Sequence, residues 1–182
     1  MPRVEGSLAG GDAIGYAAIG NGQNRENTPM ASFSFVDHWH LDAPIDAVWL
    51  EITDPLDWPS WWPSMQRVEE IEPGDAQGIG AVRRHTVKGA LPYRVSFEMR
   101  TTVVEEHQRL EGEATGDVHG RGRWTFSGND KTTDVTYEWI VDVTKDWMVL
   151  LAPIMRPLFG WNHHFVMRRG LKGLTTRLAA RR

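Results

Sequence analysis

The sequence predicts an α+β domain in which a curved antiparallel sheet of seven strands wraps around a long C-terminal helix. Three observations predict it. Apolar and polar residues alternate with a period of two in six segments between residues 65 and 144. Another alternating segment, residues 33–41, comes first, and two short proline-bounded helical segments follow it. Beyond residue 146 the apolar residues recur at helical spacing.

Length and composition agree with one domain. The 182 residues are enough to bury a proper core. The chain has no cysteine, and no segment approaches the roughly 20 apolar residues of a membrane span. We therefore expect a cytoplasmic protein without stable membrane insertion. Residues 1–30 lack clear periodicity and the pattern of a secretory signal, so we expect a flexible tail, with the domain spanning residues 31–182.

The first strand leads into the first helix. One face of the strand at 33–41 carries Phe33, Phe35, Trp39 and Leu41. Pro44 then suits the first turn of a helix. Helical spacing follows at Ile45, Val48, Trp49 and Ile52, and Asp54-Pro55 ends the helix.

The segment DWPSWWPSM, residues 57–65, places Trp58, Trp61 and Trp62 within five positions. Its two prolines exclude a long helix and a central strand. We expect a short helical piece, called here the tryptophan elbow, that presents large aromatic side chains to a neighbouring element. For each tryptophan, core packing is favoured over ligand contact.

The sheet is completed by six strands, which we predict at 66–73, 80–88, 92–104, 108–118, 121–128 and 133–144. Gly, Pro, Asn and Asp mark most of the breaks, including a turn from Gly116 to Gly120. Each strand whose faces can be assigned has one apolar and one polar face, which is typical of an antiparallel sheet covered on one side.

The closing helix contains helix-breaking residues. Pro153 and Pro157 predict a kink near its start or a separate leading turn. Gly160, Gly170 and Gly173 each cost roughly 1 kcal/mol against Ala, which is tolerable where the backbone must approach the sheet closely. If the sheet curls around this helix, the side chains are not expected to fill the space between them completely.

Three segments carry a resemblance to a known superfamily. They are WHLDAPIDAVW at 39–49, the WPSWWP of the tryptophan elbow, and LLAPIMRPLFGWNHHFVMRRGLKGL at 150–174. Together they resemble the helix-grip superfamily, called SRPBCC or START and birch-pollen-allergen-like, in its bacterial polyketide cyclase/dehydrase and lipid-transport branch. The resemblance covers about residues 31–180. It implies a cavity for hydrophobic ligands, in which some aromatase/cyclases catalyse ring closure and dehydration. It also implies that the tryptophan elbow wedges between the sheet and the long helix.

Polar residues inside such a cavity would orient a ligand. Arg83 and His85 share a strand face with Ala81 and Val87. These apolar residues at the two ends favour an inward position for the set, although an exposed basic face is the alternative. Arg83 could bind an enolate or carboxylate oxygen, and His85 could move protons. With Tyr93, they are our candidate catalytic residues.

Ten residues are predicted to contact the ligand: Trp39, Trp61, Trp62, Phe97, Trp124, Tyr137, Trp139, Met155, Phe159 and Asn162. Asn162 either points into the cavity or caps the backbone of a neighbouring strand. Asp37 shares a face with Phe35 and Trp39, so it is either a buried acid or an exposed residue at the strand end; we favour exposure.

Other site types are not favoured. His38 and His40 share a strand face, but His163 and His164 diverge by about 100° on a helix. No cysteine or HExxH pattern supports a metal site, and no cofactor is expected. Arg121-Gly-Arg123-Trp124 mixes basic and aromatic residues as single-strand binders do. Because the rest of the chain is acidic, a hairpin end is favoured, and we expect no nucleic acid partner.

These observations support three functions. The first is binding of a hydrophobic small molecule, lipid-like or polyketide-like, in the internal cavity. The second is a cyclase, aromatase or dehydratase acting there. The third is lipid transfer at a membrane surface, because residues 147–182 hold seven Lys or Arg and no acid. The plain alternative for these cations is to complement the helix dipole. The sequence does not determine the oligomeric state.

Overall fold

The computed structural model describes residues 31–143 and 146–181, with side chains for residues 32–142 and 156–181. The expected tail at 1–30 lies outside the described residues. The elements are, in order, β1 (Ala31–Leu41), α1 (Ile45–Thr53), the 3-10 helix η1 (Pro55–Asp57), α2 (Trp58–Trp61), β2 (Met65–Glu72), β3 (Val82–Val87), β4 (Val95–Glu105), β5 (Arg109–Gly116), β6 (Val118–Gly128), β7 (Thr133–Val143) and α3 (Asp146–Ala180).

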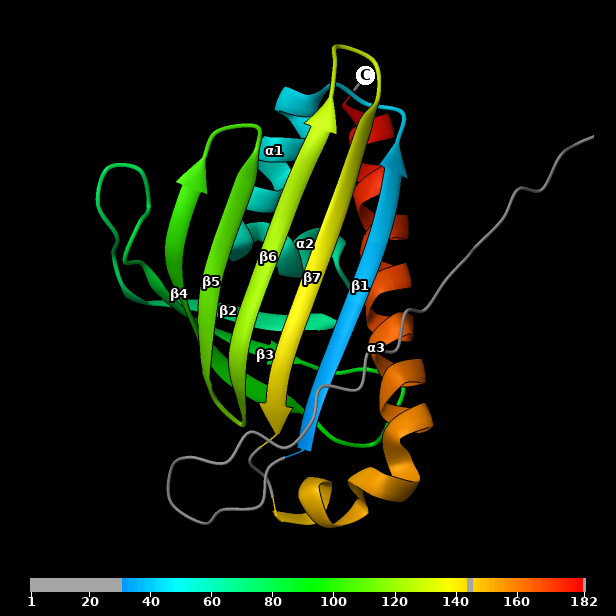
Figure 1. The fold of residues 1–182 in the computed structure, drawn as a ribbon. Coiled ribbons are helices and arrows are strands. Elements are labelled where there is room, and N and C mark those ends of the chain that lie inside the picture. The colour runs from blue at the N-terminus through cyan, green and yellow to red at the C-terminus, as the bar shows by residue number, and fades with distance from the viewer. Residues whose placement is uncertain (1–30, 144–145, 182) are drawn as a thin grey trace, which may run out of the picture.

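The strands form one antiparallel sheet in the order β1-β7-β6-β5-β4-β3-β2. Because the short helices separate β1 from β2, these strands take opposite edges. Figure 1 shows the sheet curving strongly, with β2 and β3 crossing behind the layer of β6, β7 and β1, and with α3 along the open side next to β1. The predicted helix-grip fold is confirmed.

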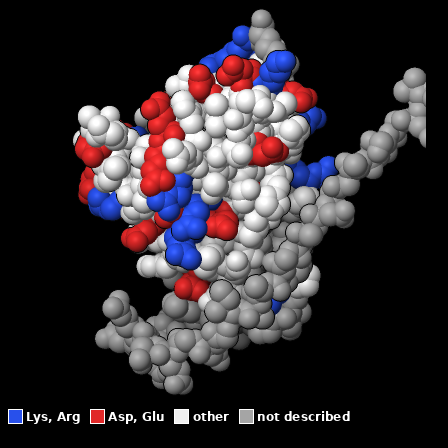
Figure 2. All heavy atoms as spheres, turned by 45° about the horizontal axis from the view of Figure 1, so that its top comes forward, with Lys and Arg blue, Asp and Glu red and all other residues white. Residues whose placement is uncertain are grey.

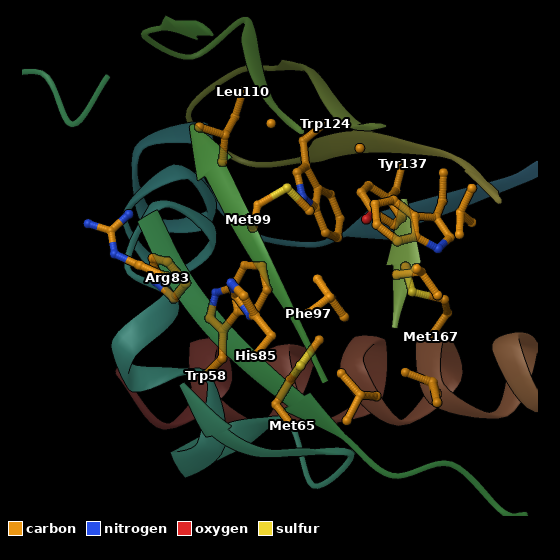
Figure 3. A pocket seen from close by; sticks show the side chains of 18 of the residues that line it. Trp58, Met65, Arg83, His85, Phe97, Met99, Leu110, Trp124, Tyr137 and Met167 are labelled. Carbon is orange, nitrogen blue, oxygen red and sulfur yellow. The ribbon is translucent and has the colours of Figure 1, made fainter. Parts of the chain in front are cut away.

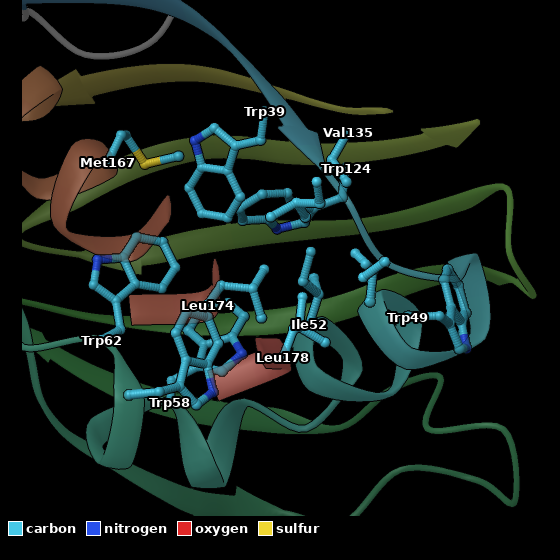
Figure 4. Close-up of a cluster of buried hydrophobic side chains, with 14 of the residues drawn as sticks. Trp39, Trp49, Ile52, Trp58, Trp62, Trp124, Val135, Met167, Leu174 and Leu178 are labelled. Carbon is cyan, nitrogen blue, oxygen red and sulfur yellow. The ribbon is translucent and has the colours of Figure 1, made fainter. Parts of the chain in front are cut away.

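The tryptophan elbow forms the centre of the main core. Trp62 is 1% exposed, and its indole Nε1 donates to the carbonyl of Val166 on α3 over 2.9 Å. Figure 4 shows Trp58 and Trp62 beneath Trp39 and Trp124, close to Leu174 of α3. The elbow therefore joins the sheet to α3, as the resemblance implied.

Two glycines allow this contact. A Cβ atom at Gly170 would lie 2.5 Å from the Trp62 ring, and one at Gly173 would lie 1.8 Å from the Trp61 carbonyl oxygen. We had expected these glycines to bring α3 close to the sheet. At these two positions the structure differs from that expectation, because Gly170 and Gly173 face the elbow, while other parts of α3 lie against β1.

Most strand boundaries agree with the prediction, and two differences have clear causes. The expected turn from Gly116 to Gly120 shrinks to Asp117, because Gly120 pairs within β6 and lies too close to the Ile140 carbonyl oxygen for a side chain. Strand β4 begins three residues later than predicted, at Val95, after a loop whose Ala90 and Leu91 N–H groups are bound by Asn162 of α3. Figure 1 shows the first turns of α3 bent away from the rest, in line with the predicted kink.

Candidate functional site

A cavity of about 260 Å³ lies between the sheet and α3. It is larger than the roughly 150 Å³ apolar cavity that accepts benzene in an engineered protein, and slightly below the usual range for drug-sized ligands. Its walls come from all seven strands of the sheet, from the elbow and from α3, and most are apolar (Figure 3). Curvature of the sheet creates this space, because a flat sheet would lie directly against the helix.

Stacked aromatic rings form one wall. The rings of Trp124 and Tyr137, neighbours on β6 and β7, lie 4.1 Å apart at 26°. Tyr137 also stacks on Trp139, with centroids 6.2 Å apart. Phe97 of β4 continues this wall: its ring centroid lies 5.7 Å from that of Trp139, and it stacks on His85 of β3 at 5.4 Å and 10°. The wall thus offers flat apolar surfaces suited to a ring-containing ligand.

His85 is the most deeply buried polar residue of the cavity. It is 4% exposed, and its Nδ1 atom has no hydrogen-bond partner among the described residues. Burial, with a smaller contribution from the positive charge of Arg83, lowers the pKa of His85 to about 4. The imidazole is therefore neutral at physiological pH and keeps a lone pair. An unpaired buried nitrogen costs stability, which makes a binding role worth testing.

Arg83 lies at one end of the cavity. Its Nη2 atom is 3.3 Å from Glu70 Oε2, while its buried Nε has no partner in the described part of the chain. Figure 3 shows the guanidinium directed away from the ring of His85. The stem therefore lines the cavity, and the charged group would have to turn to reach a ligand at the centre.

The tyrosines provide hydroxyl groups. Burial raises the pKa of Tyr93. Burial, followed by the nearby Asp37 carboxylate, raises the pKa of Tyr137 far above its usual range. Both side chains therefore remain protonated phenols that can donate a hydrogen bond.

Asn162 of α3 points into the cavity and also binds the backbone of a neighbouring segment, which the sequence offered as alternatives. Its side chain lines the cavity, and its Oδ1 accepts hydrogen bonds from the backbone N–H groups of Ala90 at 2.8 Å and Leu91 at 3.2 Å. A Cβ atom at Gly89 would lie 2.1 Å from this oxygen, so the close approach needs glycine. Asn162 thus fastens the β3–β4 loop, residues 88–94, onto α3.

The expectation that Asp37 is exposed is wrong. Its side chain is 14% exposed, and its Oδ2 lies 2.8 Å from Nε2 of His163. The reason is that α3 runs next to β1 and covers this face of the strand. His163 lines the cavity, although the sequence suggested it only as a metal ligand that we did not favour.

Seven of the ten predicted ligand contacts line the cavity: Trp62, Phe97, Trp124, Tyr137, Trp139, Phe159 and Asn162. The three candidate catalytic residues, Arg83, His85 and Tyr93, also line it. Trp39 and Trp61 do not; they pack inside the tryptophan cluster, with Trp39 5.3 Å from Trp124 and Trp61 5.5 Å from Trp62. Met155 lies outside the described side chains. Contact with a ligand stays a prediction for all of these residues.

Sequence reasoning left several lining residues unassigned. Besides His163, they include Met65, Met99, Val166 and Met167. Met99 shares the apolar face of Phe97, so alternation could have identified it. The two residues on α3 follow no such signal, because helical spacing alone does not say which side faces a hollow.

Three further properties bear on partners. No group of three or more His, Cys, Asp or Glu within the described residues could hold a metal ion. No described helix is long and apolar enough to cross a membrane. On the face seen in Figure 2, Lys and Arg lie among Asp and Glu rather than in a patch of one sign. Cations also pair with carboxylates across strands, as Arg84 does with Glu98 at 2.6 Å.

Comparison with known proteins identifies the family. The family model described as polyketide cyclase / dehydrase and lipid transport matches residues 32–179. No curated protein matches the chain. Three solved structures share the fold, all below 25% identity. The Zhui aromatase/cyclase from Streptomyces sp. R1128 is 17% identical, with a TM-score of 0.66 over 83% of this chain and 96% of that one.

The second is a START superfamily protein from Mycobacterium smegmatis, 13% identical, with a TM-score of 0.66 over 82% of this chain and 99% of that one. The third is norcoclaurine synthase from Thalictrum flavum in complex with dopamine and hydroxybenzaldehyde. It is 17% identical, with a TM-score of 0.53 over 88% of this chain and 96% of that one. Given the curved sheet, the cavity and a family match over most of its length, the chain belongs to the polyketide cyclase/dehydrase and lipid transport family.

Proposed function

We propose that this domain binds a mostly apolar, ring-containing small molecule in the cavity between the sheet and α3. The observation that carries the proposal is the cavity itself, about 260 Å³ with mainly apolar walls and a few polar groups. Burying 100 Å² of ligand surface there contributes roughly 2.5 kcal/mol before ordering costs. The stacked rings of Trp124 and Tyr137 support a flat ligand. The structural relative that holds dopamine and hydroxybenzaldehyde makes an aromatic compound a reasonable first choice.

Native mass spectrometry of freshly purified protein, followed by a screen of aromatic, polyketide-like and lipid compounds, tests this function. Val95→Phe adds bulk to the cavity wall and should weaken binding roughly tenfold or more. Val36→Phe is the matched control, because Val36 is 41% exposed. Equal binding by both variants, or no binding by the unaltered protein, contradicts cavity binding.

A cyclase, aromatase or dehydratase is the second candidate, and the unpaired Nδ1 of His85 favours it. A neutral imidazole can accept a proton from a carbon acid, although a pKa of about 4 makes His85 a weak base. A turned Arg83 or a tyrosine hydroxyl would stabilise the enolate oxygen.

Enolisation can be measured without knowing the substrate. We expect the protein to accelerate deuterium exchange at the central carbon of 1-phenylbutane-1,3-dione, and His85→Leu to reduce the acceleration by roughly a hundredfold. Binding of the diketone without faster exchange would argue against the enzyme while leaving the binding function intact. Lipid transfer through the basic end of α3 stays a prediction. Liposome sedimentation unchanged by charge reversal at Arg168, Arg169 and Lys172 would argue against it.

A further inference from the structure

The Asp37–His163 pair is a second polar site of the cavity that the proposed function leaves unused. Asp37 lies on β1 and His163 on α3, and their side chains are only 14% and 16% exposed. In the sheet order, β7, β6, β5 and β4 separate β1 from β3, which carries Arg83 and His85. His163 therefore lines a different wall of the cavity from Arg83 and His85, and its partner Asp37 is not itself a lining residue.

The contact determines the protonation of the imidazole. An ionised carboxylate can only accept hydrogen bonds, so Nε2 of His163, 2.8 Å from Asp37 Oδ2, must carry a proton. In a neutral imidazole the other nitrogen, Nδ1, then holds the lone pair. No described residue hydrogen-bonds Nδ1, and this atom is not among the fully buried unpaired ones. A neutral His163 thus offers an acceptor at Nδ1, not a donor.

The surroundings hold the ring in place. Phe35 stacks on the His163 ring at 4.1 Å and 12°, so the ring plane is fixed by this stack and by Asp37. Phe33 and Phe159 pack edge to face nearby, with centroids 5.6 Å apart. One oriented acceptor in an apolar wall is the kind of group that sets the orientation of a ligand.

Charge limits which ligand group fits. The Asp37 carboxylate makes this wall unfavourable for an anion, and Tyr137, its neighbour in the β1–β7 register, remains a neutral phenol. A neutral hydroxyl can instead donate directly to Nδ1.

We infer that His163 accepts, through Nδ1, a hydrogen bond from a phenol-type or enol-type hydroxyl of the bound ligand, and that Asp37 is the positioning residue that holds His163 in this tautomer. The inference rests on the proposed function, because it concerns the orientation of a ligand in the same cavity.

The tautomer can be measured first, without ligand. In ¹⁵N-labelled protein at pH 7.5, His163 should show a protonated Nε2 and an unprotonated Nδ1, with its signals identified by their loss in His163→Phe. Asp37→Leu should move the two nitrogen shifts towards each other, and Asp37→Asn, which keeps an acceptor oxygen, should restore much of the difference. A protonated Nδ1 in the unaltered protein would overturn the inference.

Binding then tests the acceptor. The probes are 2-naphthol, which can donate a hydrogen bond, and 2-methoxynaphthalene, which cannot. One hydrogen bond predicts roughly three- to tenfold tighter binding of 2-naphthol to the unaltered protein. In His163→Phe, which keeps a ring against Phe35, the two affinities should become about equal.

Two further variants make the result interpretable. Asp37→Leu/His163→Phe removes the carboxylate that His163→Phe would leave buried, and it should show the same equal affinities if the single variant fails to fold. His38→Phe makes the same change on the exposed side of β1 and should keep the preference for 2-naphthol. A preference that survives in the folded His163 variants overturns the inference and leaves the proposed function standing. No binding of either probe to the unaltered protein contradicts both.

Discussion

Two parts of α3 face the interior in different ways. Around Gly170 and Gly173 the helix lies directly on the tryptophan elbow, and Leu174 next to them is fully buried. About two to four turns earlier, Phe159, Asn162 and His163 face the cavity. The same helix therefore fastens the domain at one end and leaves a hollow at the other. Changes at the packed end should alter stability, whereas changes at the hollow end should alter binding.

The largest expected effect comes from breaking the packed end. Trp62→Ala removes a ring that is 1% exposed and leaves the Val166 carbonyl without its indole donor. We expect a loss of about 3–5 kcal/mol in the free energy of unfolding, measured by urea denaturation. Trp161→Ala is the control on the same helix, since Trp161 is 52% exposed and should cost at most about 0.5 kcal/mol. Similar losses for both would remove the distinction between the two parts.

The second prediction concerns His85 in the hollow part. Its pKa of about 4 lies below the value of 6.5 for a free histidine, so the unfolded state binds more protons between these two pH values. The part of the free energy of unfolding that depends on a neutral His85 is therefore fully present above pH 6.5. It is lost as the pH falls towards 4. At 1.36 kcal/mol per pH unit, the loss is roughly 3 kcal/mol.

His85→Phe keeps a ring for the stack on Phe97 but does not titrate. Carboxylates common to both proteins cancel in the comparison. As the pH drops from 7 to 4, the free energy of unfolding should fall more for the unaltered protein than for His85→Phe, measured by urea denaturation. A constant difference across this range would mean that His85 is not held neutral by burial.

The outcome shows what a pattern of alternation can and cannot predict. It located the strands and placed Arg83 and His85 inward, because one apolar face must be buried whatever covers it. It also put Asp37 on the apolar face of β1, and the prediction of exposure was wrong because alternation does not reveal which element covers the end of a strand. His163 was missed for the same reason, since its role depends on where α3 crosses β1.

The tryptophans illustrate a second limit. Trp39 and Trp62 lie in one cluster, yet only Trp62 reaches the cavity. Both have the size and burial of core residues, and nothing local in the sequence separates them. The position of the hollow depends on how completely all elements pack together, which is a property of the whole domain.

The third prediction returns to the packed end. Gly173→Ala should raise helix propensity by roughly 1 kcal/mol, yet its Cβ would lie 1.8 Å from the Trp61 carbonyl oxygen. Because backbone atoms must move, we expect a net loss of about 1–3 kcal/mol by thermal or urea unfolding. Thr175→Ala, at an exposed position two residues away, serves as the reference and should change stability little. A stabilised Gly173→Ala would show that the elbow is less tightly held than the contacts indicate.

The smallest effect on stability, about 1 kcal/mol, is expected for Asn162→Ala. The variant removes the oxygen that accepts from Ala90 and Leu91, so amide hydrogen exchange in the β3–β4 loop should become faster. Since Asn162 also lines the cavity, a bound aromatic probe should dissociate faster.

Asn129→Ala offers a close control: Asn129 Oδ1 accepts from the backbone N–H groups of Lys131 and Thr132 in the β6–β7 turn. That variant should loosen its own turn and leave both the β3–β4 loop and the probe unaffected. If Asn162→Ala changes neither exchange nor dissociation, then the loop is held by its apolar contacts with Phe159, and the hollow end of α3 needs no polar fastening.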